Sequence, residues 1–255
     1  MRKLCWEDMA RLSKNQTRVA LVTGGAKRVG RAIVERLAAA GFDVAFTYRG
    51  SDREANQLVA SLKKKRRCAL AISVDLTLAE SASQVAQQFS STFNRLDLLV
   101  NSASLYEPSS LSKTNPEQLS RLWMIHVATP MMLCQHLAPL LRKNHGHVVN
   151  MVDLLAEKPW PEYLAYCTSK AGLVNLTLGL ARELAPQVTV NGIAPGVVGW
   201  PKNYPRAEQE KYLKRVPLGR AGTPNDVANL VHFLATDGAY ITGQIIRLDG
   251  GRSIV

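Results

Sequence analysis

Short apolar runs alternate with amphipathic stretches along nearly the whole chain, and this alternation constrains the fold more than any other feature of the sequence. The apolar runs that predict strands are residues 18–24, 43–48, 68–75, 96–101, 146–153, 188–196 and 243–251. The amphipathic stretches that predict helices are residues 30–41, 52–66, 78–93, 119–143, 163–185 and 224–236. Strands and helices in this order form a parallel sheet with right-handed crossovers. We therefore predict a single-domain α/β fold of Rossmann type, a doubly wound parallel sheet of about seven strands with helices on both faces.

Three segments depart from the regular alternation. Residues 1–16 are polar and predict an N-terminal extension, with room for a short helix at residues 6–12. In the predicted long helix, Pro130 and Pro139 are expected to cause kinks, because proline cannot donate the helical hydrogen bond. Residues 196–215 are irregular and follow a strand at the edge where such sheets build their sites. They fit either a mobile lid over a substrate or an ordinary surface loop.

Length and composition limit the class of protein. The chain has 255 residues, of which 46% are hydrophobic, and this is enough for one large core. Its first residues lack the apolar core of a signal peptide, and no apolar run approaches the ~20 residues that cross a membrane. The four cysteines lie far apart without a C-x-x-C pair, and the histidines form no H-E-x-x-H motif. We therefore predict a cytoplasmic protein with reduced thiols, no membrane partner and no metal site.

The chain is strongly basic, with a formal net charge of +12, and one basic block stands out. This block, "KKKRR" at residues 63–67, has the composition of nucleic-acid or targeting segments. It also ends a predicted helix, where cations complement the carbonyl end of the helix dipole. Because no aromatic residue interleaves with the block, we favour the helix end and expect no nucleic-acid partner. A positive surface would still steer anionic cofactors and substrates to the protein.

A loop that contains glycines, "TGGAKRVG" at residues 23–30, joins the first predicted strand to the first helix. Glycines there allow a tight turn and bring backbone N–H groups close to phosphate oxygens, although the strict fingerprint G-x-G-x-x-G is absent. After the second predicted strand, Arg49 and Ser51 offer a cation and a hydroxyl where the 2′-phosphate of NADPH would lie. NAD-dependent proteins place an acidic residue at this point, so we predict NADPH as the cofactor. The nearby Asp52 is expected to start the next helix.

Together with further motifs, this loop resembles the short-chain dehydrogenase/reductase family over residues 17–255. In the family loop T-G-x-x-x-G-x-G, Gly24 and Gly30 match the outer glycines, and Arg28 replaces the middle one. The other matching motifs are "NSAS" at 101–104 for N-N-A-G, Tyr166 and Lys170 for Y-x-x-x-K, Asn191, Pro195 and Gly196 for N-x-x-x-P-G, and "ITGQIIRLDGG" at 241–251 for the last strand. The resemblance implies an NADP-binding reductase domain, usually assembled as a homotetramer.

The resemblance also implies where the cofactor binds. The expected cofactor-binding residues are Gly24, Lys27, Arg28, Val29, Tyr48, Arg49, Ser51, Asp75, Leu76, Asn101, Ala103, Ser104, Tyr166, Lys170, Pro195 and Gly196. Among them, Asp75 is expected to bind the edge of the adenine ring. The alternative for Asp75 is a simple helix cap.

Three residues are predicted to carry the chemistry: Asp153, Tyr166 and Lys170. Tyr166 and Lys170 stand at i and i+4 on one helix face, so we expect the lysine ammonium to lower the tyrosine pKa and make the phenol a proton donor. Most members of the family carry a serine at the position of Asp153, where its hydroxyl holds a carbonyl oxygen. A carboxylate suits instead a substrate that presents N–H donors, or one whose ring nitrogen must take a proton. The alternative is that Asp153 only caps the end of a strand.

The replacements at Arg28 and Asp153, the "NSAS" motif and Tyr106 together resemble the pteridine reductase branch, which includes dihydromonapterin reductases. In that branch an aromatic residue at the position of Tyr106 stacks on the pterin, a contact worth about 1 kcal/mol; a surface-loop role is the alternative. The expected substrate-binding residues are Arg28, Ser104, Tyr106, Asp153 and Tyr166. The resemblance implies NADPH-dependent reduction of dihydrobiopterin, dihydromonapterin or dihydrofolate, with hydride transfer to a ring carbon and protonation of the adjacent nitrogen.

Two other functions stay open. One is an ordinary carbonyl reductase of the same fold, such as a 3-oxoacyl thioester or sugar dehydrogenase, which the missing serine disfavours. The other is a non-catalytic NADP-binding protein, which the intact Tyr166–Lys170 pair disfavours because binding alone needs no proton donor. His126 stands where the family usually carries an asparagine of a water relay. It fits such a relay or a packed core residue equally well, so it is not among the predicted catalytic residues.

Overall fold

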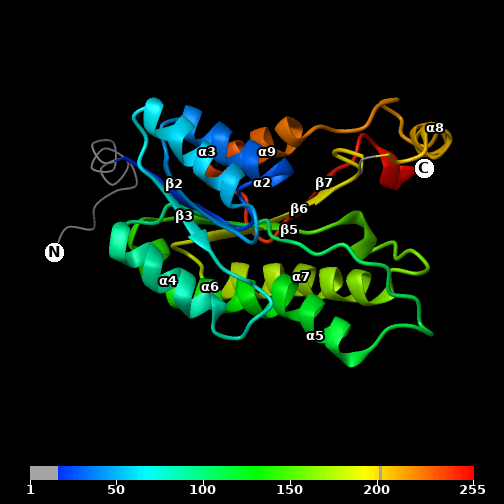
Figure 1. Ribbon diagram of the computed structural model, residues 1–255, viewed down its shortest axis with the longest axis horizontal. Helices are drawn as coiled ribbons and strands as arrows, with labels where there is room; N and C mark the ends of the chain where they lie inside the picture. Colours follow the sequence, from blue (N-terminus) through cyan, green and yellow to red (C-terminus); the bar gives the residue numbers. More distant parts are fainter. Residues whose placement is uncertain (1–16, 201–202) are drawn as a thin grey trace.

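Seven parallel strands form one sheet in a computed structural model that describes residues 17–200 and 203–255 (Figure 1). The strands are β1 (Val19–Val22), β2 (Asp43–Tyr48), β3 (Ala69–Ser73), β4 (Leu98–Asn101), β5 (His147–Met151), β6 (Thr189–Pro195) and β7 (Ile245–Leu248). Their order is β3-β2-β1-β4-β5-β6-β7, and every neighbouring pair is parallel. The predicted doubly wound α/β fold is therefore confirmed. The predicted N-terminal extension, residues 1–16 with its short helix, lies outside the described residues.

Helices cover both faces of the sheet (Figure 1). One face carries α2 (Arg28–Ala39), α3 (Asp52–Lys64) and α9 (Pro224–Thr236). The other carries α4 (Ser81–Thr92), α5 (Pro116–Trp123), α6 (Thr129–Lys143) and α7 (Leu164–Glu183). Because both faces are covered, β1 is apolar and buried along its whole length, as is typical of parallel sheets. Each face has its own hydrophobic cluster, so the sheet is held rigidly between two packed layers.

The strand order reverses at β1, and hydrogen bonds join the two loops that separate there. β1 lies between β2 and β4, so a crevice is expected at the carboxyl ends of these strands. Thr23 donates its backbone N–H to Val100 O at 2.9 Å. The Thr23 hydroxyl oxygen accepts the backbone N–H groups of Ser102 at 2.9 Å and Ala103 at 3.0 Å. One threonine thus ties the loop after β1 to the loop after β4 at the base of the crevice.

The helical region predicted at residues 119–143 is divided into three segments, which corrects the prediction of one kinked helix. Between α5 and α6, Met124–Ala128 forms a single π-helical turn. Thr129 donates its N–H five residues back, to Met124 O. The next residue, Pro130, has no N–H to continue the regular pattern, which explains why the interruption falls here. In contrast, α6 runs through Pro139 to its end.

The segment after β6 contains a helix that the sequence analysis did not predict, α8 (Arg206–Leu213). None of its residues is buried, so it lacks the apolar stripe that marks an amphipathic helix. Next to it, the ring of Trp200 stacks on Tyr204 with centroids 5.1 Å apart and meets Tyr212 edge-on at 5.4 Å. The predicted lid at residues 196–215 stays a prediction.

One helical stretch in the described part of the chain, Pro116–Lys143, is long and apolar enough to cross a membrane by length and composition. Half of its most apolar window is buried within the fold. The stretch consists of α5, the π-helical turn and α6, which lie against the sheet in Figure 1. The buried apolar side chains of this stretch belong to the core of the fold.

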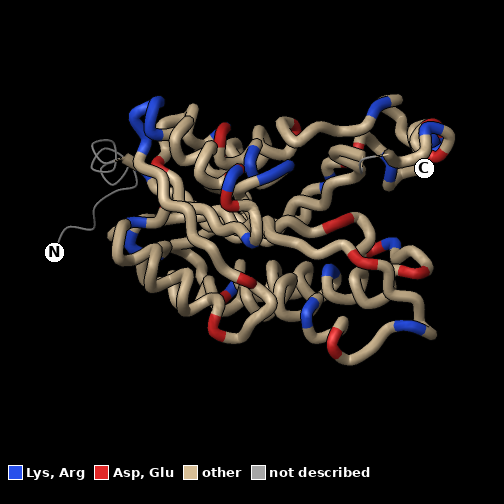
Figure 2. Tube along the Cα trace, in the orientation of Figure 1, with Lys and Arg blue, Asp and Glu red and all other residues tan. Residues whose placement is uncertain are grey.

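The basic block at residues 63–67 lies at the end of α3, as expected for a helix end. α3 ends at Lys64, and the side chains from Lys63 to Arg66 are exposed. Figure 2 shows the cationic residues gathered at this end of α3. Arg67 donates to Gly41 O at 2.8 Å and so joins the block to the turn after α2. The position agrees with cations that complement the carbonyl end of a helix dipole.

Candidate active site

A cleft of about 400 Å³ opens where the strand order reverses. It is lined by Gly24, Lys27, Arg28, Val29, Gly30, Thr47, Tyr48, Arg49, Val74, Asp75, Leu76, Ser102, Ala103, Ser104, Leu105 and Ile125. Most of the predicted cofactor-binding residues are in this set. The predicted residues that do not line the cleft are Ser51, Asn101, Tyr166, Lys170, Pro195 and Gly196.

Several residues line the cleft without having been predicted, and one of them gives a signal in the sequence. Thr47 is a hydroxyl residue that directly follows the apolar residues 44–46 of strand β2. It is 1% exposed, and its oxygen accepts the backbone N–H of Gly24 at 3.0 Å. A buried threonine near the end of an apolar strand is the kind of polar exception that marks a site. Val74, Ser102, Leu105 and Ile125 carry no comparable signal, because they contribute ordinary apolar or loop surface.

The loop after β1 needs its two outer glycines for different reasons. Gly24 has φ of +68°, and a Cβ there would lie 2.9 Å from Ala103 Cα. A Cβ on Gly30 would lie 2.2 Å from Gly24 O. Arg28 takes the left-handed region at φ of +49°, where a non-glycine residue costs about 1–2 kcal/mol. The chain therefore accepts backbone strain to place a guanidinium at the cleft, where the family loop has a glycine.

The start of α2 is suited to an anion. The helix has no acidic residue in its first turn, and no side chain caps its first N–H groups. Those N–H groups and the positive end of the helix dipole favour phosphate oxygens. Lys27, which precedes the helix, is paired with Glu54 at 2.9 Å and is half exposed. A nucleotide diphosphate therefore fits the residues at this end of the cleft.

The end of β2 places Arg49 beside Asp75. Arg49 Nη1 lies 3.1 Å from Asp75 Oδ2. The other Asp75 oxygen accepts the N–H of Thr77 at 2.9 Å and its hydroxyl at 2.7 Å. Partial burial opposes ionisation, but the hydrogen bonds from Thr77 and Arg49 win and lower the pKa of Asp75. The helix-cap alternative for Asp75 is wrong, because α4 begins only at Ser81; the carboxylate instead holds a turn at the cleft.

The predicted residues that do not line the cleft lie at other places in the fold. Asp52 is the first residue of α3, as expected, and Ser51 precedes it. Asn101 is buried and donates to Asn150 Oδ1 at 2.8 Å, which gives it a place between β4 and β5 rather than in the cleft. Gly196 follows β6, and a Cβ there would lie 3.2 Å from the Tyr212 hydroxyl oxygen. Pro195 and Gly196 therefore belong to the opposite side of the site, near α8.

The predicted catalytic residues come together at the ends of β5 and α7. Asp153 Oδ2 accepts the Tyr166 hydroxyl at 2.7 Å. Asp153 Oδ1 accepts the backbone N–H of Leu155 at 2.9 Å and thereby caps a single 3₁₀ turn, Leu154–Ala156. The alternative of a strand-end cap is corrected, because β5 ends at Met151 and Asp153 caps the 3₁₀ turn that follows. The other carboxyl oxygen faces the Tyr166 hydroxyl, and the catalytic role of Asp153 stays a prediction.

The electrostatics of the pair correct one prediction. Lys170 is buried, donates to Met151 O at 2.8 Å and lies 5.8 Å from the centroid of the Tyr166 ring. Burial lowers the pKa of Lys170 to about 8, although Asp153 opposes this shift. Burial and then the Asp153 charge raise the pKa of Tyr166 well above its usual value. The pKa of Tyr166 is therefore raised rather than lowered, contrary to the expectation, because burial and then the Asp153 carboxylate disfavour the phenolate.

The lowered pKa of Lys170 predicts how activity depends on pH. Lys170 is charged below about pH 8 and neutral above it. If its charge offsets the phenolate left by proton transfer, kcat/KM is expected to fall about tenfold per pH unit above that value. Steady-state rates from pH 6 to 10 measure this, with the Kd of the cofactor followed over the same range as a control. A flat kcat/KM up to pH 10 would contradict the role.

Two further tyrosines complete the wall beside the reaction centre. The ring of Tyr106 stacks on Tyr163, with centroids 4.6 Å apart and planes 16° apart. It also meets the Tyr166 ring edge-on, with centroids 4.9 Å apart. Tyr106 is 51% exposed, so one face packs on Tyr163 while part of the ring stays accessible. The sequence analysis missed Tyr163 because the residue lies outside every motif.

The side toward α8 contributes Tyr212 and Arg252, neither of which was predicted. The Tyr212 hydroxyl oxygen accepts the backbone N–H of Val197 at 3.2 Å. The guanidinium of Arg252 lies over the Tyr212 ring, 5.6 Å from its centroid. The concentration of aromatic residues between 200 and 212 was the available signal in the sequence.

In the described part of the chain, no three potential metal ligands lie close together. Cys68, Cys134 and Cys167 are free thiols.

A glycine-bounded cleft at the strand reversal, next to a buried tyrosine–lysine pair, is the arrangement of a nucleotide-dependent oxidoreductase. The family model described as enoyl-(acyl carrier protein) reductase matches residues 24–253. The chain belongs to the short-chain dehydrogenase/reductase family.

Similar proteins extend over nearly the whole chain. A 3-oxoacyl-(acyl-carrier-protein) reductase from Staphylococcus aureus is 33% identical over 240 residues, which cover 92% of this chain and 98% of the relative. A reductase of the same name from Aquifex aeolicus is 31% identical over 243 residues, with 93% and 98% covered. These names agree with the ordinary carbonyl reductase of the sequence analysis rather than with the pteridine reductase branch.

Two solved structures share the fold closely. A blue fluorescent protein from a metagenomic library, solved in complex with NADPH, has a TM-score of 0.87 and 33% identity, with 92% of this chain and 98% of that chain covered. The acetoin dehydrogenase from Enterobacter cloacae has a TM-score of 0.86 and 29% identity, with 94% and 97% covered.

Proposed function

We propose that this oxidoreductase reduces a C=N bond of a dihydropterin with NADPH. The observation that carries the proposal is the Asp153 carboxylate, which accepts the Tyr166 hydroxyl at 2.7 Å. A carbonyl oxygen gains negative charge during reduction, and a carboxylate in contact with the proton donor would repel it. A pterin instead presents ring and amino N–H groups, for which a carboxylate is a strong acceptor.

The proposed proton path uses Tyr166 and Asp153. The raised pKa keeps Tyr166 protonated at neutral pH, and its hydrogen bond to Asp153 orients the hydroxyl. NADPH, when bound, supplies the hydride to the ring carbon. Tyr166 then breaks its O–H bond and gives the proton to the adjacent ring nitrogen, with Asp153 as the neighbouring group that can share that proton. Lys170, charged below about pH 8, offsets the negative charge that remains on the phenol oxygen.

NADPH as the cofactor is supported by the residues at the end of β2. Tyr48 and Arg49 line the cleft with Asp75, and the start of α2 offers free N–H groups to a diphosphate. The Arg49 side chain is 55% exposed, so it can turn from Asp75 to a 2′-phosphate. Gly24, Lys27, Arg28 and the remaining lining residues would hold the rest of the nucleotide.

Replacing Arg49 with alanine is expected to weaken NADPH binding by about 10- to 100-fold, because a charge-assisted hydrogen bond contributes about 1.5–3 kcal/mol. NADH binding should change little, since NADH has no 2′-phosphate. Fluorescence titration with both nucleotides measures the two Kd values. Arg53→Ala, on the exposed side of α3, is the matched control. Equal losses for NADPH and NADH would contradict the assignment of Arg49 to the phosphate.

A second candidate, reduction of a 3-oxoacyl thioester, is favoured by the names of the two relatives above. It requires the carbonyl oxygen to be held by Tyr166 alone, or Asp153 to be protonated. The two candidates are separated by one comparison. Purified protein is given NADPH with dihydrobiopterin, with dihydrofolate and with acetoacetyl thioester, and loss of NADPH absorbance is followed. Turnover confined to the thioester would defeat the pterin proposal.

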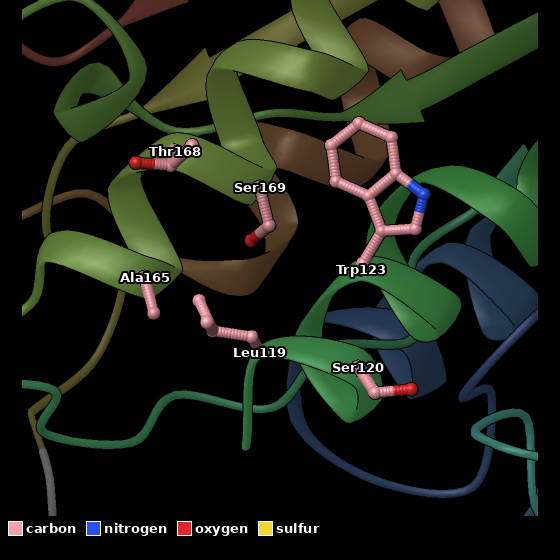
Figure 3. Close-up of a pocket in the computed structure, with 6 residues that line it drawn as sticks. All are labelled: Leu119, Ser120, Trp123, Ala165, Thr168 and Ser169. Carbon is pink, nitrogen blue, oxygen red and sulfur yellow. The ribbon is translucent and has the colours of Figure 1, made fainter. Parts of the chain in front are cut away.

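We also propose that the chain assembles as a homotetramer, with α5 and α7 in one contact. Figure 3 shows a surface pocket of about 300 Å³ between these helices, lined by Leu119 and Trp123 from α5 and Ala165 from α7. Leu119 and Trp123 are 48% and 49% exposed, an unusual degree for large apolar side chains on adjacent turns. The same helices from another copy would cover them. Light scattering measures the assembly, and a monomer would contradict the proposal.

The lid at residues 196–215 is a further proposal, supported by the position of Tyr212 beside the site.

A further inference from the structure

The buried histidine of the π-helical turn is hydrogen-bonded through both ring nitrogens. His126 is 1% exposed. Its Nε2 lies 2.8 Å from Ser104 Oγ and 3.3 Å from the backbone N of Leu105. Its Nδ1 lies 2.8 Å from Ser169 Oγ. His126 therefore links Ser104, which lines the cleft, to Ser169 in the interior of α7.

Two independent contacts require the imidazole proton to be on Nδ1. A backbone N–H can only donate, so the N–H of Leu105 needs the lone pair of Nε2. Ser169 already donates its hydroxyl proton to Tyr166 O at 2.7 Å, so its oxygen is left to accept from Nδ1–H. The ring is neutral, because burial and then the charge of Lys170 lower the pKa of His126 well below its usual value.

This tautomer determines what Ser104 can offer to a ligand. Because Nε2 has no proton, the Ser104 hydroxyl donates to it. One competing acceptor, Leu105 O, lies 3.5 Å from this hydroxyl, which is too long to compete with a contact of 2.8 Å. The lone pairs of Ser104 then remain for the cleft. A hydrogen bond from Ser104 to the Tyr166 oxygen would lower the pKa of Tyr166, so this oxygen competes with His126 Nε2 for the Ser104 proton, while Asp153 accepts from the Tyr166 hydroxyl.

We propose that His126 is a positioning residue that holds the Ser104 hydroxyl as a hydrogen-bond acceptor, so that the site selects a ring with N–H donors. The inference rests on the proposed pterin function and explains how the site would distinguish a heterocycle from a ketone. A ketone oxygen needs donors beside Tyr166, and neither Ser104 nor Asp153 supplies one. The nicotinamide carboxamide also carries N–H groups, so cofactor binding is measured separately from substrate binding.

The first test reads the tautomer without any substrate. Long-range ¹H–¹⁵N correlation spectra of protein labelled at histidine distinguish a protonated nitrogen from an unprotonated one, and the His126→Gln variant assigns the signal. We expect a protonated Nδ1 and an unprotonated Nε2 from pH 6 to 8. A protonated Nε2, or a charged ring in this range, would overturn the proposal.

The second test is a double-mutant cycle on His126 and Ser104. Asparagine reaches only the position of Nδ1, so His126→Asn leaves the Ser104 hydroxyl without its acceptor. Glutamine reaches the position of Nε2 and can accept there. We expect the KM for dihydrobiopterin to rise about tenfold in His126→Asn and in Ser104→Ala, the effect of one hydrogen bond, and less than about threefold in His126→Gln. The Kd of NADPH is measured in all three variants, because Ser104 also lines the nucleotide cleft, and the rise in KM for dihydrobiopterin should exceed any rise in this Kd.

The cycle separates positioning from a merely structural role. If His126 acts through Ser104, His126→Asn adds nothing in the Ser104→Ala background. If the rises in KM of the two single variants multiply in the double variant, the two residues act independently and the proposal is overturned. A loss confined to NADPH binding would also overturn it. Failure of the proposed function gives a different result. A protein that reduces only thioesters but has a protonated Nδ1 would refute the pterin function while the Ser104 hydroxyl is still held as an acceptor. A protein that reduces dihydropterins with a protonated Nε2 keeps the function and defeats this inference.

Discussion

Replacing Asp153 with serine is expected to lower kcat/KM for dihydrobiopterin by about 10²- to 10³-fold, within the range for losing part of an acid–base pair. Serine removes the acceptor that holds the Tyr166 hydroxyl at 2.7 Å and supplies a donor in its place. The same change should leave turnover of an acetoacetyl thioester unchanged or raise it. NADPH consumption with each substrate measures both effects. A smaller loss of kcat/KM with the pterin than with the thioester would contradict the proposed role of the carboxylate.

Two further variants separate charge from folding in that experiment. Serine also weakens the cap on the N–H of Leu155, a loss of about 1 kcal/mol, so thermal unfolding must be measured beside activity. Asp153→Asn keeps an oxygen for the cap while removing the charge, and it should lose pterin turnover with little loss of stability. Asp237→Ser, beyond the end of α9, is the matched surface control.

Replacing Tyr166 with phenylalanine is expected to lower kcat by about 10²- to 10⁴-fold for any substrate, because the proton donor is lost. The ring is buried, and phenylalanine keeps its packing against Tyr106 and His126. NADPH should therefore bind with nearly unchanged Kd. Single-turnover rates and fluorescence titration check the two halves of this expectation.

The matched control for the tyrosine is Tyr240→Phe, since Tyr240 is fully exposed at the surface. Retention of more than about a tenth of wild-type kcat in Tyr166→Phe would assign the proton to another group, with Asp153 the nearest candidate. Loss of NADPH binding in the same variant would indicate a structural role for the hydroxyl instead.

The sheet could be predicted because its signal is local. β2 spans residues 43–48 and α9 spans residues 224–236, as the apolar runs and helix caps predicted. The interruption at Met124–Ala128 could not be predicted from periodicity, because π- and α-helical turns bury nearly the same side chains. The helix α8 was not predicted because none of its residues is buried, so its sequence carries no apolar stripe.

The site was predictable where backbone geometry demands a residue type and less so where packing decides. Gly24 is required by its close approach to Ala103 and Gly30 by its contact with Gly24 O, and such constraints appear in the sequence. The pKa of Tyr166 was assigned the wrong direction, because helix spacing showed that Lys170 is near but not that the phenol is buried and in contact with Asp153. The role proposed for His126 depends on three hydrogen bonds to residues at least 21 positions away from it in the chain.

The hydrogen bonds of Thr23 affect how a nucleotide can enter and leave the crevice. Because its oxygen clamps the N–H groups of Ser102 and Ala103, the loops after β1 and β4 are joined as one rigid wall. If the lid proposed at residues 196–215 moves, we expect the nucleotide to enter and leave on that opposite side, while the wall held by Thr23 stays in place.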